Sequence, residues 1–79
     1  MAKWNDDVVD ILIDLAKTQP ALAKAIRLSI QQIEKHPARI GQLILQGRYV
    51  YTDPQRRFRI SYNFHPESHE IEIVVLHLF

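Results

Sequence analysis

The longest regular pattern in the chain is an alternation of apolar and polar residues from Arg57 to Phe64. This period of two predicts a β-strand with one buried face and one face exposed to solvent. The apolar positions carry side chains that suit a half-buried pleated surface: Phe58, Ile60, Tyr62 and Phe64. We predict that this segment is the middle strand of a sheet whose open, polar and cationic face is the functional surface.

One strand is predicted on each side of this one. Residues 48–52 form the earlier strand, and residues 53–56 form a turn in which Pro54 suits the second position of a type I turn. Residues 71–79 form the last strand, where strict alternation places Ile71, Ile73, Val75 and His77 on one face. Because the other face is also mostly apolar, we expect burial on both sides near the end of the chain. The short turns predict an antiparallel meander.

Two amphipathic helices are predicted before the strands. Asn5 suits the N-cap of the first, whose apolar stripe is Val8, Ile11, Leu12 and Leu15. Pro20 suits the first position of the second, and His36-Pro37 ends it. The second apolar stripe is Leu22, Ile26, Ile30 and Ile33. The short loop between the two predicts an antiparallel hairpin, and residues 38–47 are expected to form a helical turn or a partly buried loop.

This order of elements predicts an α+β fold, with an N-terminal antiparallel helix hairpin packed on a three-stranded antiparallel meander sheet. A chain of 79 residues is long enough for one domain, which we place at residues 1–79. The expected core joins the middle strand to both helix stripes: Phe58, Ile60, Tyr62, Leu12, Leu15, Ile26 and Ile30.

Composition limits the location and the cofactors. The chain has no cysteine, which fits a reducing compartment, and no apolar run approaches the ~18 residues of a membrane span. With no signal-peptide pattern at its start, we expect a cytoplasmic protein that does not contact a membrane. No cofactor motif is present. His65 and His69 lie in a turn that does not fix metal-binding geometry, so we expect no metal site.

Three motifs, taken in order, resemble the RelE/ParE superfamily of bacterial toxins. They are FRISY at residues 58–62, HPARIGQLILQG at residues 36–47 and VLHLF at residues 75–79. The resemblance covers residues 5–79 and implies two antiparallel helices on a twisted antiparallel sheet. Only Met1 to Trp4 precede the first helix, so the chain is identified as a compact variant that lacks the usual first strand of the family. The family is also strongly basic, whereas this chain has a net charge of +1.

The resemblance implies the toxin of a toxin–antitoxin pair, RelE-like, acting as a ribosome-dependent mRNA endoribonuclease. Arg59 would hold a phosphate and His77 would transfer a proton, so the two are expected to lie near one another on the exposed face of the sheet. The alternative for Arg59 is a solvated arginine paired with Glu72, and for His77 a hydrogen bond to a backbone carbonyl. The second proton-transfer group is left open among Arg57, Tyr49 and Tyr51. The expected substrate-binding residues are Arg48, Arg56 and Arg57.

Two other functions stay open. A ParE-like protein would inhibit DNA gyrase without catalytic residues, and a catalytically silent RelE-fold domain would only bind a partner peptide or its own copy. The low net charge and the missing first strand favour the silent domain, whereas the motifs favour a toxin. The expected partners are a cognate antitoxin and mRNA on the ribosome, or gyrase instead. We also expect the edge of the last strand, where Leu76, Leu78 and Phe79 are apolar, either to form a homo-oligomer or to bind a segment of the antitoxin.

Overall fold

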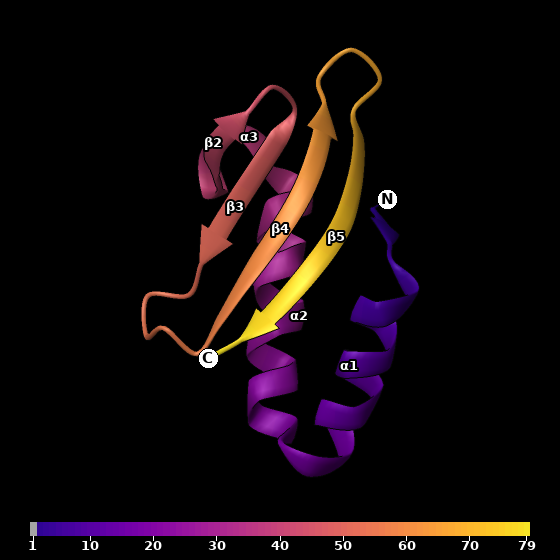
Figure 1. The fold of residues 1–79 in the computed structure, drawn as a ribbon, viewed down its shortest axis with the longest axis vertical. Coiled ribbons are helices and arrows are strands. Elements are labelled where there is room, and N and C mark those ends of the chain that lie inside the picture. The colour runs from indigo at the N-terminus through magenta and orange to yellow at the C-terminus, as the bar shows by residue number, and fades with distance from the viewer. Residues whose placement is uncertain (1) are drawn as a thin grey trace.

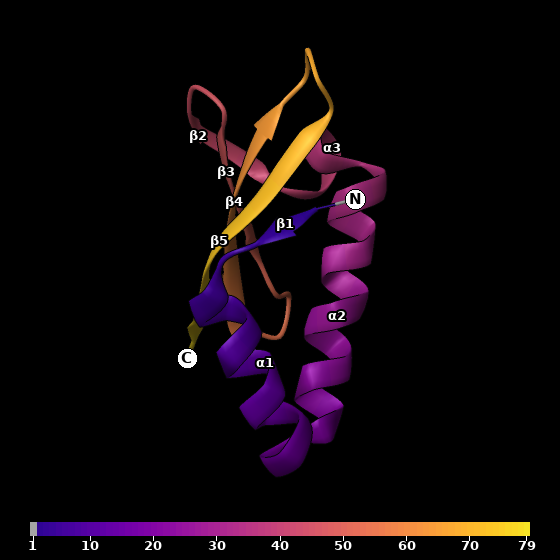
Figure 2. The same cartoon turned by 90° about the vertical axis from the view of Figure 1, so that its right-hand side faces the viewer.

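The helices cover one face of the sheet, and the other face is open toward the viewer in Figure 1. Figure 2 shows the two layers edge-on. This computed structural model describes residues 2–79. The helices in this range are α1 (Asp6–Thr18), α2 (Pro20–Lys35) and α3 (Pro37–Ile40). The strands in this range are β1 (Lys3–Trp4), β2 (Gln42–Leu45), β3 (Arg48–Thr52), β4 (Phe58–His65) and β5 (Glu70–Leu78).

The helix ends follow the predicted signals. The side-chain oxygen of Asn5 accepts a hydrogen bond from the Asp7 N–H at 2.9 Å, which caps α1. Pro20 begins α2, and His36 follows its last residue. None of the helices in residues 2–79 is long and apolar enough to cross a membrane. All seven residues that we predicted for the core are buried in one hydrophobic cluster.

The sheet has five strands in the order β1-β5-β4-β3-β2. The antiparallel meander of β3, β4 and β5 is confirmed, but the prediction of three strands was wrong. In β1, Lys3 pairs with Glu72 and Trp4 with Ile73, in parallel. The chain therefore has an N-terminal strand after all. Two residues are too few to show alternation, so only the pairing with the edge of β5 reveals this strand.

The segment after α2 is only partly as expected. The helical turn is present as α3, but residues 42–45 form the edge strand β2 and not a partly buried loop. Its three apolar side chains, Leu43, Ile44 and Leu45, are exposed, and the last of them is 70% exposed. They show no alternation because no second layer covers this edge of the sheet.

A β-bulge in β5 changes which side chains face the helices. Ser61 pairs with Val75 whereas Tyr62 pairs with Ile73, so Val74 is the extra residue. The bulge places Leu76 in the core and His77 on the open face, which corrects the strict alternation that we predicted. Burial on both faces near the end was also wrong, because Phe79 is 61% exposed.

Candidate nucleic-acid interface

A row of three polar side chains crosses one end of the open face. In the sheet register, Thr52 of β3 lies opposite Arg59 of β4, and Arg59 lies opposite His77 of β5. Arg59 Nε donates a hydrogen bond to Thr52 Oγ1 at 3.3 Å. All three residues are exposed. The prediction that Arg59 and His77 lie close together on the open face is confirmed.

The alternative pairing of Arg59 with Glu72 was wrong. Glu72 lies opposite Asn63, and the Asn63 Nδ2 donates to Glu72 Oε1 at 3.3 Å. The Arg48 Nε in turn donates to Asn63 Oδ1 at 2.7 Å. Arg48 therefore belongs to a second polar row, and the residues between the two rows on the open face are Val50, Ser61 and Val75. The structure does not bring Arg48 beside Arg59.

Phe79 completes the site next to Arg59 and His77. The Arg59 guanidinium carbon lies 5.3 Å from the centroid of the Phe79 ring, within the range of a cation–π contact. The His77 ring meets the same ring edge-on, with centroids 4.9 Å apart. The Phe79 N–H donates to the Arg57 carbonyl at 3.2 Å, which holds it in place. Sequence reasoning treated Phe79 only as an apolar end, although its position two residues after His77 puts it on the same face.

The turn between β3 and β4 separates the roles of its two arginines. Arg57 Nε donates to Asp53 Oδ2 at 2.7 Å, and the Arg57 backbone N–H donates to the same oxygen at 3.1 Å. The hydrogen bond from the Arg57 side chain is the main reason why the pKa of the buried Asp53 carboxyl lies below its ordinary value. The same pair raises the pKa of Arg57. The Arg57 guanidinium is thus engaged by Asp53.

Arg56 lies beside the site instead. It adopts a left-handed backbone with φ of 56°, which is uncommon for a residue other than glycine. The residue lines a hollow of about 520 Å³ together with Thr52, Arg59 and Phe79. Two arginines and an exposed aromatic ring thus surround one space, a composition suited to a phosphate and a base.

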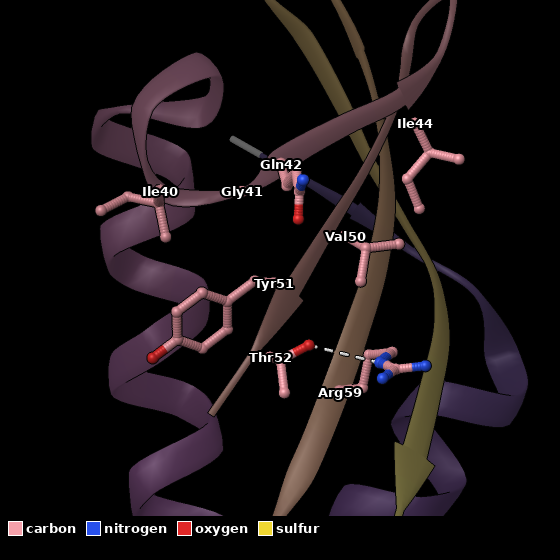
Figure 3. A pocket seen from close by; sticks show the side chains of 8 residues that line it. All are labelled: Ile40, Gly41, Gln42, Ile44, Val50, Tyr51, Thr52 and Arg59. Atoms are coloured by element: carbon pink, nitrogen blue, oxygen red, sulfur yellow. Dashed lines mark hydrogen bonds between the residues drawn. The ribbon is translucent and has the colours of Figure 1, made fainter. Parts of the chain in front are cut away.

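A second hollow, of about 530 Å³, adjoins the first at Thr52 and Arg59 (Figure 3). Its lining includes Gln42, Ile44 and Val50, and it shares Thr52 and Arg59 with the first hollow. Nothing in the sequence pattern predicted this hollow, because it forms only where β2 pairs with β3.

None of the three candidates for a second proton-transfer group joins Arg59 and His77. Tyr49 and Tyr51 pack against the core on the helix-facing side of β3, and Arg57 is bound to Asp53. Arg59 and His77 therefore lie side by side without any of these three groups next to them. Within residues 2–79, no three His, Cys, Asp or Glu side chains gather as a metal site would require.

Comparison with known proteins finds no matching family model, no matching characterised protein and no matching solved structure. What can be said of function therefore comes from the geometry of the open face. That geometry joins a guanidinium, an imidazole and an exposed aromatic ring at one end of the sheet.

Proposed function

We propose that this chain is a RelE-like toxin of a bacterial toxin–antitoxin pair, and that it cleaves messenger RNA in the ribosome. The observation that supports this best is the exposed pair of Arg59 and His77, directly opposite one another on β4 and β5. A cation beside an imidazole is the combination that RNA cleavage needs at the reacting phosphate.

The reaction is an attack of the ribose 2′-oxygen on the adjacent phosphorus. The P–O5′ bond breaks, and the products are a 2′,3′-cyclic phosphate and a 5′-hydroxyl. His77 takes the proton from the 2′-hydroxyl, and Arg59 stabilises the negative charge that develops on the phosphate oxygens. The leaving 5′-oxygen needs a second proton donor, which we assign to water or to a group of the ribosome. Cleavage by the isolated protein is therefore expected to be slow.

The surroundings of the pair suit a single strand of RNA. Arg56 extends the positive charge beside Arg59, and the exposed Phe79 ring offers a surface on which a base can stack. Contacts of arginine with phosphate do not depend on sequence, so they position the strand and do not select it. Arg48 lies farther along the face, where it would contact the strand beyond the cleavage site.

The second candidate is a catalytically silent binding domain, with a ParE-like gyrase inhibitor as one form of it. Two observations favour it. Among residues 2–79, the open face carries one proton-transfer side chain beside Arg59, and β2 exposes three consecutive apolar side chains that a protein partner would cover. In the toxin proposal this partner is the cognate antitoxin.

The test is to add the purified chain to a translation reaction and map the cuts in the mRNA. Ribosome-dependent cuts that leave 5′-hydroxyl ends, absent with Arg59→Ala, are the expected result. Inhibition of gyrase supercoiling without RNA cleavage would replace the proposal with the ParE-like function. If the folded chain shows neither RNA cleavage nor gyrase inhibition, the silent binding domain is the function that remains.

A further inference from the structure

We propose that the hollow lined by Gln42, Ile44 and Val50 binds one base of the RNA, and that Gln42 makes adenine the preferred base. This inference rests on the proposed function, because it needs a single strand of RNA on the open face. It goes further by naming the base and the residue that reads it.

The position of the hollow connects it to the reacting phosphate. Thr52 and Arg59 line this hollow and also the hollow that contains Arg56 and Phe79. A phosphate held by Arg59 thus has a space on each side, one for each of the two nucleotides that the phosphate joins. The Phe79 side offers an aromatic ring, which stacks on any base. Selectivity between bases is therefore expected in the hollow that Gln42 lines.

The walls of the hollow are those of a base-binding site. Ile44 and Val50 provide apolar contact, and Gln42 lies directly opposite Val50 in the sheet register. Figure 3 shows the Gln42 amide turned toward the space that the lining side chains enclose. A glutamine amide presents a donor and an acceptor side by side, which match N7 and the N6 amino group of adenine. Those atoms are accessible in single-stranded RNA.

The backbone just before Gln42 is held in place by Tyr62 of β4. The Tyr62 hydroxyl donates a hydrogen bond to the Pro37 carbonyl of α3. Gly41 packs so closely on Tyr62 that an added Cβ would lie 2.8 Å from two atoms of its ring. Tyr62 itself stacks on Tyr49, with ring centroids 5.4 Å apart. Because buried groups hold the segment just before Gln42, the backbone position from which its amide side chain extends is restricted.

The experiment measures binding and not cleavage, so that it does not depend on catalysis. Trinucleotides of A, G, C or U with 2′-O-methyl groups have no free 2′-hydroxyl and are not cleaved. Fluorescence anisotropy gives their affinities for the wild type, for Gln42→Leu and for the control Gln46→Leu, an exposed glutamine in the turn after β2. The wild type and the control are expected to bind the A trimer roughly tenfold more tightly than the others. Gln42→Leu is expected to bind all four alike.

Each other outcome has a defined meaning. Equal affinity of the wild type for all four trimers would overturn the inference and leave RNA binding intact, as would an adenine preference that persists in Gln42→Leu. Free AMP binding as tightly as the A trimer would also overturn it, because the ligand would be a mononucleotide. No binding of any RNA, alone or on the ribosome, would overturn the proposed function itself.

Discussion

Arg59 lies directly opposite His77 across β4 and β5, and both side chains contact the ring of Phe79. The bulge at Val74 makes this arrangement. Without the extra residue, His77 would share a face with Ile71 and Ile73 and point toward the helices. The arrangement on the open face can be tested one residue at a time.

Replacement of Arg59 by alanine is expected to abolish toxicity while the protein stays folded. If Arg59 stabilises the charge of the transition state, its loss slows cleavage by roughly 10²–10³-fold. Because the side chain is exposed, the free energy of unfolding should change by about 0.5 kcal/mol or less. Growth on expression and urea unfolding measure the two effects. Arg27→Ala, on the exposed surface of α2, is the control, and full toxicity of a folded Arg59→Ala protein would rule out the role of Arg59.

His77→Gln is expected to slow RNA cleavage by roughly 10²–10⁴-fold, the usual contribution of a general acid or base. RNA binding should change little, since glutamine keeps a polar side chain of similar reach at the exposed position. Single-turnover cleavage and anisotropy separate the rate from the affinity. His36→Gln, at the end of α2, is the matched control. Equal losses of rate in both variants would show that His77 has no special part in the reaction.

Ile30→Ala is expected to lower the free energy of unfolding by roughly 2–5 kcal/mol, because it leaves a cavity between α2 and the sheet. Ile30 is 1% exposed, whereas Leu28 on the same helix is 50% exposed. Leu28→Ala should therefore cost about 0.5 kcal/mol or less. Urea denaturation of both variants tests the core, and similar losses would contradict the arrangement of the helix layer.

The Asp53–Arg57 pair predicts a loss of stability in acid. The pKa of Asp53 is lowered from 3.8, chiefly by the hydrogen bond from Arg57, so folding favours the ionised carboxylate. Its contribution is fully present above 3.8 and is lost as the pH falls through the lower pKa of the folded state. Asp53→Asn should be less stable near neutral pH and should show a flatter acid dependence than Asp14→Asn. Thermal unfolding over a series of pH values measures this, and unchanged acid dependence in Asp53→Asn would refute it.

The free protein is expected to self-associate through an exposed sheet edge. β1 lies along β5 at Glu72 and Ile73, so part of the edge that we first assigned to assembly is covered. The exposed apolar edge is β2, and a charge on an edge strand opposes pairing. Leu45→Lys should shift the sedimentation distribution toward monomer at micromolar concentration, and Leu28→Lys on α2 should not. A wild type that is already monomeric would contradict this prediction.

The sequence by itself determined the two helices, the meander and the buried face of β4. These elements carry long periodic patterns with clear ends, such as Asn5 before α1 and Pro20 at the start of α2. It also placed Arg59 on the open face, because eight residues of β4 alternate without interruption. Local geometry fixes which side of a strand or helix a residue occupies, so such patterns can be read without knowing the partner element.

Only the tertiary structure decided the outer strands and the completed site. The two-residue strand β1 and the edge strand β2 have no alternation of their own and exist through pairing with β5 and β3. The bulge at Val74 depends on the register between β4 and β5, and it alone brings His77 beside Arg59. The hollow beside Gln42 forms where β2 meets β3. Each of these features depends on contacts between segments far apart in the chain, which the order of residues within one segment does not specify.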